Sequence, residues 1–591
     1  MKFQTKAAAL ILLATALASA AIYQVAAPRQ AASNMAAMLP QGALLTIESP
    51  DFASLLQTWN KSPEQKSWLA SDNYSVFSNS RLFGRLNDAR SEFEAAARPS
   101  ADAGINGDFL TQVAGKRSIF AWYDVGKLEF LYITRISAAQ GANIALLKDR
   151  AQWTSRQSAG TTFYLRKTTG GPIAVADQQA ESAQGQARTV AFAQVPDSAG
   201  DLLILATRED LIANALTLVH PTANAGSLAT EPWYIEAAAA LPKNAPALHM
   251  VLNLDRLVPL PAFRTYWVQQ NVSAMKQYRT AVTDLYLEKS QFREERALLL
   301  NSPDNSPEAA PLASLAALPP ANGFFRATAT HDSGLAVAAL EEKLLGRVSL
   351  NAVPETEAPD PSLEVARSGS TSDLETRIDT PAPVSAATSN QPLADAVKSA
   401  GLEAMLTYST AVPPATPAGL WVPIHSAVVL QATQTWDPLS LQSALQQSLR
   451  GNLTTATLGI DFRPETASGQ TIYTLTGPKP LFFATASKLF LISDDRDLLA
   501  AILTSTTRPA TAAQPATTIA GFNHASQRAP YARLSALVDG TSQSSDTKTQ
   551  PTFFSANLKS LSDTLAALTT QRLTERLEGL TLRQTITYQW Q

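Results

Sequence analysis

One short stretch of the sequence has the residue types and spacing of a catalytic motif. Ser273 and Lys276 stand in the order Ser-Ala-Met-Lys, and the S-x-x-K pattern supplies the serine nucleophile of penicillin-interacting enzymes. Of the elements that accompany this pattern, S-D-N occurs as Ser71-Asp72-Asn73, well before the match in the chain, whereas K-T-G is missing and Lys167–Gly170 only approximates it. We therefore interpret the match as part of an amphipathic helix and assign no catalytic residue.

Other signatures of enzyme chemistry are missing from the sequence. It has no G-x-S-x-G nucleophile elbow, no Walker loop for phosphates and no G-x-G-x-x-G dinucleotide fingerprint. It also has no cysteine, which excludes thiol catalysis, cysteine-ligated zinc and iron–sulfur clusters. We predict no cofactor.

The histidines do not form a metal-binding pattern. None pairs with another at helical spacing, so no H-E-x-x-H helix is present, although a metal site built from distant single residues stays open. His249 falls inside a predicted strand, and we interpret it as a packing residue rather than a ligand. The five histidines are His220, His249, His331, His425 and His524.

Two clusters of charge are interpreted as structural. In the predicted strand around Arg293–Arg296, alternation puts the first and third residues on one face and the second and fourth on the other. We expect cross-strand ion pairs there, worth ~0.2–1 kcal/mol each. In the second cluster, Asp494 or Asp495 is expected to cap the helix that follows, as Thr207 would in an earlier copy of the same pattern.

Two aromatic pairs lie beside predicted helices. Trp233-Tyr234 and Tyr266-Trp267 could line a glycan or lipid site. Large aromatic side chains at helix starts more often anchor a core, and we adopt that interpretation.

The sequence contains two copies of one strand–helix pattern. Residues 202–216 read LLILATREDLIANAL, and residues 489–503 read LFLISDDRDLLAAIL. Each copy has four apolar residues in a row, a polar turn and then apolar positions at helical spacing, which predicts a strand followed by a helix. TTFYL at 161–165 also aligns with QTIYTL at 470–475. The pattern predicts an internal duplication.

The remaining periodicity predicts an α+β protein. Its two similar lobes would each contain an antiparallel or mixed sheet with helices packed on one face. Between them we predict a strand at 248–254, two helices within 262–288, a strand at 292–300, and a strand and helix at 323–345. A helix at 558–577 and a strand at 580–590 would end the chain. The predicted divisions are 1–30 (leader), 38–245 (first lobe), 246–350 (middle region), 351–392 (Pro/Ser/Thr-rich linker or loop) and 393–591 (second lobe).

The N-terminus has the pattern of an export signal. Lys2 and Lys6 precede an uncharged stretch from Ala7 to Pro28, and Ala18-Ser19-Ala20 offers the small-residue pattern of a cleavage site. We favour cleavage before Ala21. The alternative is an uncleaved anchor, since about 20 apolar residues span a bilayer. Both alternatives place the body outside the cytoplasm, in the periplasm or anchored to the inner membrane.

Charge disfavours nucleic acid as a partner. The 591-residue chain has a net charge of −3 and no long basic run, whereas nucleic-acid binding needs a concentrated positive footprint. Any contact with a membrane would be made through the N-terminal segment, if it is not cleaved.

Several stretches resemble a family of exported bacterial proteins of unknown function, of the kind found in acidobacteria. The resemblance lies in Leu39–Glu48, Arg264–Asn271, Arg293–Arg296, Asp373–Asp379 and the terminal strand. It implies export and carries no reaction signature, so no site residue is transferred. We expect a non-catalytic envelope protein that binds a protein, glycan or lipid. The alternative is an envelope hydrolase with a dispersed active site.

Overall fold

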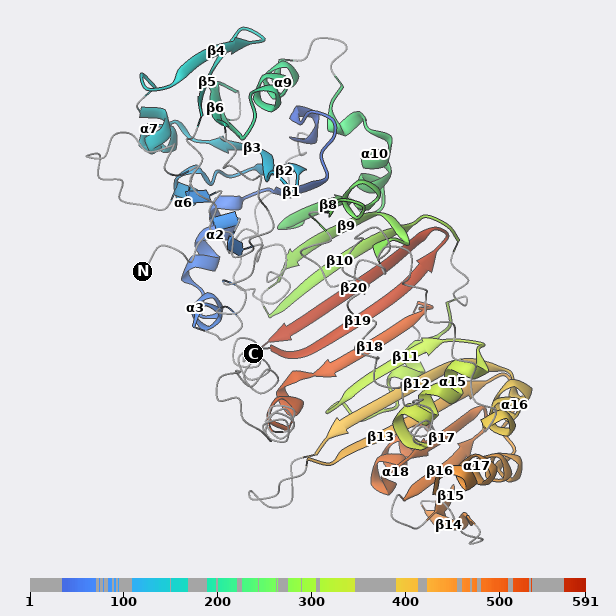
Figure 1. Ribbon diagram of the computed structural model, residues 1–591. Helices are drawn as coiled ribbons and strands as arrows, with labels where there is room; N and C mark the ends of the chain where they lie inside the picture. Colours follow the sequence, from blue (N-terminus) through green and yellow to red (C-terminus); the bar gives the residue numbers. More distant parts are fainter. Residues whose placement is uncertain are drawn as a thin grey trace, which may run out of the picture. The chain divides into compact units, whose positions relative to one another are not determined.

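The computed structural model separates into two compact units (Figure 1). Unit 1 lies within Met1–Asn305 and His524–Gln591, and unit 2 within Ser306–Asn523. The structure describes residues 35–70, 109–167, 189–261, 275–345, 390–412, 422–530 and 568–590 apart from short breaks, together with single residues of 71–94 and residues 263 and 533. The fold is α+β, and every strand pairing described below is antiparallel.

Unit 1 is built on a sheet whose described strands follow the order β4-β5-β6-β7-β3-β2-β1-β8-β9-β10-β20-β19. The strands are β1 (Leu45–Ser49), β2 (Ser118–Asp124), β3 (Glu129–Ile136), β4 (Thr154–Ser158), β5 (Thr161–Lys167), β6 (Thr189–Val195), β7 (Asp201–Ala206), β8 (Leu248–Asn253), β9 (Tyr278–Leu287), β10 (Gln291–Leu300), β19 (Leu568–Glu578) and β20 (Thr581–Trp590). The helices are η1 (Met35–Met38), α2 (Phe52–Lys61), α3 (Pro63–Leu69), α6 (Phe109–Val113), α7 (Ala138–Asn143), α8 (Ala145–Lys148), α9 (Glu209–Val219), η2 (Leu228–Thr230), α10 (Pro232–Ala239) and α11 (Leu254–Leu257).

Unit 2 has a smaller sheet with the strand order β14-β15-β16-β17-β13-β12-β11-β18. Its strands are β11 (Phe324–Ala329), β12 (Leu402–Ala411), β13 (Ile424–Ala432), β14 (Arg463–Ala467), β15 (Gln470–Leu475), β16 (Leu481–Ala486), β17 (Leu489–Ser493) and β18 (Thr518–Asn523). Its helices are α14 (Leu312–Ala316), α15 (Ser333–Leu340), the π-helical η3 (Glu341–Leu345), α16 (Gln391–Ala400), α17 (Pro438–Leu453) and α18 (Arg496–Ser505).

The strand order of unit 2 repeats that of the first eight strands of unit 1. In each unit the first strand of the chain pairs with the second and the eighth, and the fourth to seventh strands continue the sheet beyond the third. Each copy of the repeated sequence forms the predicted strand and helix, β7 with α9 and β17 with α18.

The central strands of each unit are buried on both faces, which corrects the prediction that helices pack on one face. Along β7, Leu202 and Ile204 share a buried cluster with α9, whereas Leu203 and Leu205 share another with α2 and α8. In unit 2, residues of α14 and α18 cover one face of β13 and residues of α15, α16 and α17 cover the other. The unbroken apolar runs of these strands are the sequence signature of burial on both faces.

A trio of aromatic rings fills the core of unit 1 beside β5 and β6. The ring of Phe192 stacks on that of Tyr164, with centroids 5.2 Å apart and an interplanar angle of 21°. Trp153 meets Phe192 edge-on at 4.9 Å and 88°. Both geometries are favoured for aromatic pairs.

The same trio occurs in unit 2. Phe483 stacks on Tyr473 with centroids 4.6 Å apart and an angle of 6°, and Phe462 meets Phe483 edge-on at 5.1 Å and 73°. The strand registers relate the trios, since the central phenylalanine lies opposite the tyrosine in both units. The third ring immediately precedes β14, as Trp153 precedes β4.

Parts of two predicted helices are strands. Residues 278–287, assigned to the second helix of 262–288, form β9, and residues 568–577 of the predicted C-terminal helix lie in β19. In β9, Val282, Asp284, Leu285 and Tyr286 are all buried, so burial on both faces hides the two-residue alternation that identifies a strand. The strands predicted at 248–254, 292–300 and 580–590 are confirmed, and so are the strand and the helix predicted within 323–345.

The compact units differ from the predicted lobes. Residues 246–305 and the C-terminal strands belong to unit 1, and unit 2 begins near residue 306 rather than 393. The reason is strand pairing: β8 joins β1, and β20 joins β10. Helix α16 also starts at Gln391, inside the segment predicted as a linker, whose residues 351–389 lie outside the described residues.

The predicted leader also lies outside the described residues, so its cleavage stays a prediction. Within the described parts of the chain, no helix combines the length and apolarity needed to cross a membrane.

Candidate functional site

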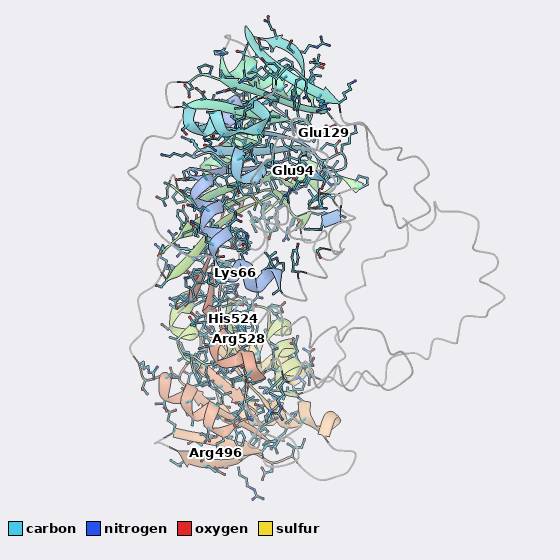
Figure 2. All side chains as sticks on the ribbon, turned by 90° about the vertical axis from the view of Figure 1, so that its left-hand side faces the viewer. Lys66, Glu94, Glu129, Arg496, His524 and Arg528 are labelled. Carbon is cyan, nitrogen blue, oxygen red and sulfur yellow. The ribbon has the colours of Figure 1, made fainter. Side chains whose placement is uncertain are left out.

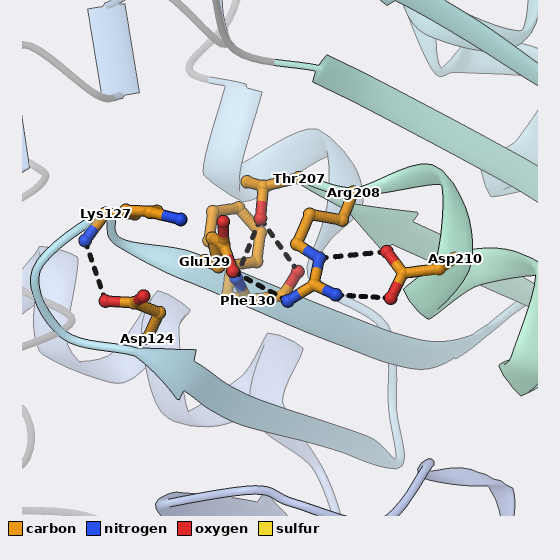
Figure 3. A network of polar contacts seen from close by, with 7 residues as sticks. All are labelled: Asp124, Lys127, Glu129, Phe130, Thr207, Arg208 and Asp210. Atoms are coloured by element: carbon orange, nitrogen blue, oxygen red, sulfur yellow. Dashed lines mark hydrogen bonds and ion pairs between the residues drawn. The ribbon is translucent and has the colours of Figure 1, made fainter. Parts of the chain in front are cut away.

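One polar network in unit 1 joins the start of β3 to the turn between β7 and α9 (Figure 3). Thr207 Oγ1 accepts a hydrogen bond of 2.8 Å from the Phe130 backbone N–H. The Arg208 guanidinium lies 2.8 Å from Glu129 Oε2 and also donates to both oxygens of Asp210. The hydrogen bonds to Asp210 and then Glu129 raise the pKa of Arg208, so the junction is held by a permanent charge.

Unit 2 has a junction of the same design with different side chains. Asp494 Oδ1 accepts a 2.8 Å hydrogen bond from the Ser426 backbone N–H, at the position where Thr207 acts in unit 1. His425 Nδ1 lies 3.7 Å from Asp495 Oδ2 and 3.8 Å from Asp494 Oδ1. The histidine makes ion pairs there only when it is protonated.

The prediction that an aspartate caps α18 is confirmed. Asp495 Oδ1 accepts a 2.7 Å hydrogen bond from the Leu498 backbone N–H. The corresponding prediction for Thr207 is wrong, because its hydroxyl contacts the Phe130 backbone and α9 begins after Arg208 without a side-chain cap. A threonine beside a neighbouring strand can bond that strand instead of its own helix.

Burial is the main influence on the proton affinity of the Asp494 carboxyl. Desolvation raises the pKa of this carboxyl above its usual value, and the nearby Asp495 carboxylate adds to the rise, while the Ser426 N–H and His425 oppose it. The folded protein therefore binds the Asp494 proton more tightly than the unfolded chain. The contribution of this tighter proton binding to the free energy of unfolding is complete below the pKa of Asp494 in the unfolded chain. It is lost as pH rises through the raised pKa of the folded protein.

We expect Asp494→Asn to stabilise unit 2 at pH 7 and to have little effect near pH 3. Asparagine keeps an acceptor for the Ser426 N–H but carries no charge beside Asp495. The gain should be roughly 1 kcal/mol or less, the usual size of a partly exposed electrostatic interaction. Urea unfolding followed by hydrogen exchange in β13 and β17 would measure it. A gain of equal size at both pH values would show that the charge of Asp494 is not its cause.

A second polar cluster crosses the sheet of unit 1. The strand registers place Glu48, His249, Asp284 and Glu295 in one row across β1, β8, β9 and β10. Glu48 pairs with Arg117, whose Nη2 lies 2.8 Å from its carboxylate. These side chains come from segments up to about 250 residues apart in the chain, so antiparallel pairing assembles the row.

The centre of this row is a buried carboxylate. Asp284 is 3% exposed, and its Oδ1 lies 2.5 Å from His249 Nδ1. The Tyr286 hydroxyl donates to Asp284 Oδ2 at 3.3 Å. Burial first, and then the Asp284 charge, raise the pKa of Tyr286 to about 12, so it stays a neutral donor.

Beside this row, a cation–π contact joins Arg293 of β10 to Tyr286 of β9. The Arg293 guanidinium carbon lies 4.2 Å from the centre of the Tyr286 ring. Arg293 also pairs with Glu295 and, at 3.5 Å, with Glu288. The neighbouring Arg296 pairs with Glu294 at 2.6 Å. The predicted faces of 293–296 are confirmed, but the ion pairs within this block run along the strand rather than across strands.

Neither histidine in these clusters is arranged as the base of a serine hydrolase. Among the described residues, the side chains of His249 and His425 contact carboxylates and no hydroxyl group, whereas the Ser-His-Asp mechanism needs a hydroxyl beside the imidazole. No group of three or more His, Asp or Glu side chains in the described part of the chain could hold a metal ion.

The other residues singled out from the sequence have separate places. Ser273 and the Tyr266-Trp267 pair lie outside the described residues. Trp233 and Tyr234 meet edge-on at 5.6 Å with Tyr234 buried, which confirms a core anchor.

Sequence comparison gives no family: no protein-family model and no curated protein matches the chain. Among solved structures, three crystal forms of the protein TP0453 show a partial likeness. Form I is 11% identical and aligns with 46% of this chain and 82% of TP0453, at a TM-score of 0.21. Form III is 11% identical over 49% of this chain and 87% of TP0453, at a TM-score of 0.22. Nothing about function follows from this likeness.

Proposed function

We propose that this chain is a non-catalytic binding or scaffolding protein of the cell envelope. Its partner would be a protein, a glycan or a lipid. The leader pattern at residues 1–30 supports export, either to the periplasm or to the inner-membrane surface with an N-terminal anchor.

The observation that carries the proposal is that charged side chains of the strands pair with one another. Arg117 pairs with Glu48, His249 with Asp284, and Arg293 with Glu295. These pairs join strands or brace one strand, so the charges hold the scaffold together. Charges engaged in this way support a scaffolding or binding role.

We also propose that the two units arose by duplication of one eight-stranded module. The common strand order, the two aromatic trios and the two strand–helix junctions support this origin. A further support is the helix after the first strand of each unit, which is capped by an aspartate: Asp51 accepts from the Ser54 N–H, and Asp332 from the Gly334 N–H.

Charge reversal at matching positions strengthens the duplication argument. In unit 1, Arg156 of β4 lies 3.6 Å from Glu209 of α9. In unit 2, Glu465 of β14 lies 3.6 Å from Arg496 of α18, whose side chain is labelled in Figure 2. The strand registers make β4 equivalent to β14 and β7–α9 equivalent to β17–α18. Both halves of the pair have changed sign together, as expected when a contact is kept through divergence.

The second matching pair also has reversed sign when His425 is protonated. Arg208 faces Glu129 in unit 1, whereas Asp495 faces His425 in unit 2. A chance likeness between two sheets would not require paired reversals at two separate contacts.

Quantitative pull-down from envelope extract tests the binding function. The full chain, with the leader processed as in cells, should recover one partner reproducibly and in fixed proportion. Recovery of the full chain from the cytosol with residues 1–20 intact would contradict export. Hydrolysis of an envelope substrate by the purified chain, lost on His249→Gln or His425→Gln, would instead establish the hydrolase alternative.

A further inference from the structure

Among the described residues of unit 1, β4 is an open edge strand. β4 lies at one end of the strand order and pairs on one side with β5 (Figure 1). Its residues Thr154, Ser155, Arg156 and Gln157 are exposed. An unpaired edge strand presents backbone N–H and C=O groups to which another strand can add.

The β4–β5 turn fixes which backbone groups face outward. Ala159 and Gly160 both have positive φ, at 48° and 74°, which is the signature of a two-residue type I′ turn. In such a hairpin the flanking pair, Ser158 and Thr161, exchanges hydrogen bonds, and alternate pairs along the strands follow. The backbone groups of Ser155 and Gln157 therefore point away from β5.

In unit 2 the equivalent edge strand, β14, contains a proline. Pro464 of β14 lies opposite Tyr473, as Ser155 lies opposite Tyr164. Proline has no N–H, so it is tolerated in an edge strand where that group would face outward. This placement supports the assignment of Ser155 as an outward donor. One edge has therefore lost a donor that the equivalent edge keeps.

Helix α9 holds the open edge in place. The Ser158 hydroxyl donates to the Ala213 carbonyl oxygen at 2.8 Å, and Arg156 faces Glu209 of the same helix at 3.6 Å. The edge is thus preorganised, which reduces the conformational entropy that a binding strand must overcome.

The charge of Arg156 determines which strands can pair with β4. A strand pairing with the outward groups of Ser155 and Gln157 places its central residue directly opposite Arg156, in a non-hydrogen-bonded pair whose side chains lie close together. The Arg156 side chain is 59% exposed, so that residue can reach it beside Glu209. If two copies of β4 paired through both outward residues, Arg156 would face itself, and like charges directly opposite are destabilising.

We propose that β4 is a docking site for an extended segment of a partner protein that carries an acidic residue opposite Arg156. This inference rests on the proposed binding function and names its partner class. The added strand would gain main-chain hydrogen bonds from Ser155 and Gln157 and an ion pair with Arg156.

The probe for this proposal is a fluorescein-labelled peptide, Thr-Val-Thr-Glu-Thr-Val-Thr, titrated with the full chain by fluorescence anisotropy. We expect it to bind about 10-fold more tightly than the same peptide with central Arg, or with N-methylated amides on the residues that face β4. Ser155→Pro should weaken binding by about 10-fold, because it removes one outward donor and leaves the β4–β5 hydrogen bonds in place. Pro464→Ser is the matched control and should leave this binding unchanged.

A charge exchange sharpens the test. The double variant Arg156→Glu/Glu209→Arg copies the pair that unit 2 carries naturally and keeps the contact with α9. It should prefer the peptide with central Arg. No binding of the acidic peptide by the unmodified chain at about 1 mM, or equal binding by Ser155→Pro, would overturn the proposal.

Two results separate this inference from the proposed function. If the Ser155→Pro chain still recovers the envelope partner, the docking site is wrong and the binding function stands. If the peptide binds as expected but no envelope partner is recovered, the edge is a strand-binding site and the proposed function fails.

Discussion

Phe483→Ala should destabilise unit 2 by roughly 3–5 kcal/mol, the usual cost of removing a buried aromatic side chain. Phe483 is fully buried and lies at the centre of its cluster. Its ring stacks on Tyr473 and meets Phe462 and Phe490 edge-on, with centroids 4.6, 5.1 and 6.1 Å away. Alanine would leave a cavity that three rigid rings cannot fill by a small shift.

Phe192→Ala is the matched change in unit 1 and should cost a similar amount there. Phe192 is also fully buried between Tyr164 and Trp153. Hydrogen exchange measured by mass spectrometry reports on the two units separately within the full chain. Each variant should lower protection mainly in its own unit, because the altered core belongs to that unit.

Tyr473→Phe provides the control for the stacking geometry. It keeps the ring on Phe483 and removes only the hydroxyl, so its cost should stay below about 1 kcal/mol. A Phe483→Ala chain with protection within experimental error of the unmodified chain would refute the central position of this ring. Loss of protection by equal amounts in both units would refute their independence.

Local signals in the sequence predicted the strand–helix repeat well. The run LLILA and the run LFLIS each form a buried strand, and a helix with apolar spacing follows each. The cap of α18 was predictable because an aspartate, Asp495, directly precedes the helix. These features depend on neighbours within a few residues, which a single sequence contains.

Long-range pairing could not be predicted in the same way. The C-terminal hairpin, turned at Gly579 with φ of 61°, adds β20 to β10 and so returns to unit 1. β19 carries Leu573 and Leu577 at a spacing that also fits a helix, and most of its residues are only partly buried. Hydrophobic periodicity therefore gave the wrong element, and nothing local names the partner of a strand.

The polar row of unit 1 could not be predicted either, because it depends on which strands pair. His249 was placed correctly in a strand, but its partner Asp284 fell in a segment predicted as a helix. The pair forms because β8 and β9 are adjacent, with His249 opposite Asp284. A correct assignment of β9 would have brought the two side chains to one face, although the register comes only from the structure. The open edge at β4 was also hidden, because it appears only when Ser155 is compared with Pro464.

His249→Ala should destabilise unit 1 by roughly 3 kcal/mol, because it leaves the buried Asp284 carboxylate without its closest partner. Asp284 is 3% exposed, and among the described residues the Tyr286 hydroxyl at 3.3 Å would be its remaining side-chain hydrogen-bond partner. A buried carboxylate that loses a hydrogen-bonding partner pays its desolvation cost without compensation. Urea unfolding of the full chain, followed by hydrogen exchange in β8 and β9, would measure the loss.

A double-mutant cycle separates the energy of the His249–Asp284 interaction from the cost of removing the two side chains. Asp284→Val alone removes the charge and leaves His249, 23% exposed, in partial contact with water, so it should cost less than His249→Ala. Valine suits a strand, and the double variant His249→Val/Asp284→Val should recover much of the loss, since apolar residues can replace a buried ion pair with little cost. If the double variant instead loses as much stability as the two single changes together, the side chains act independently and the short contact between them stabilises nothing.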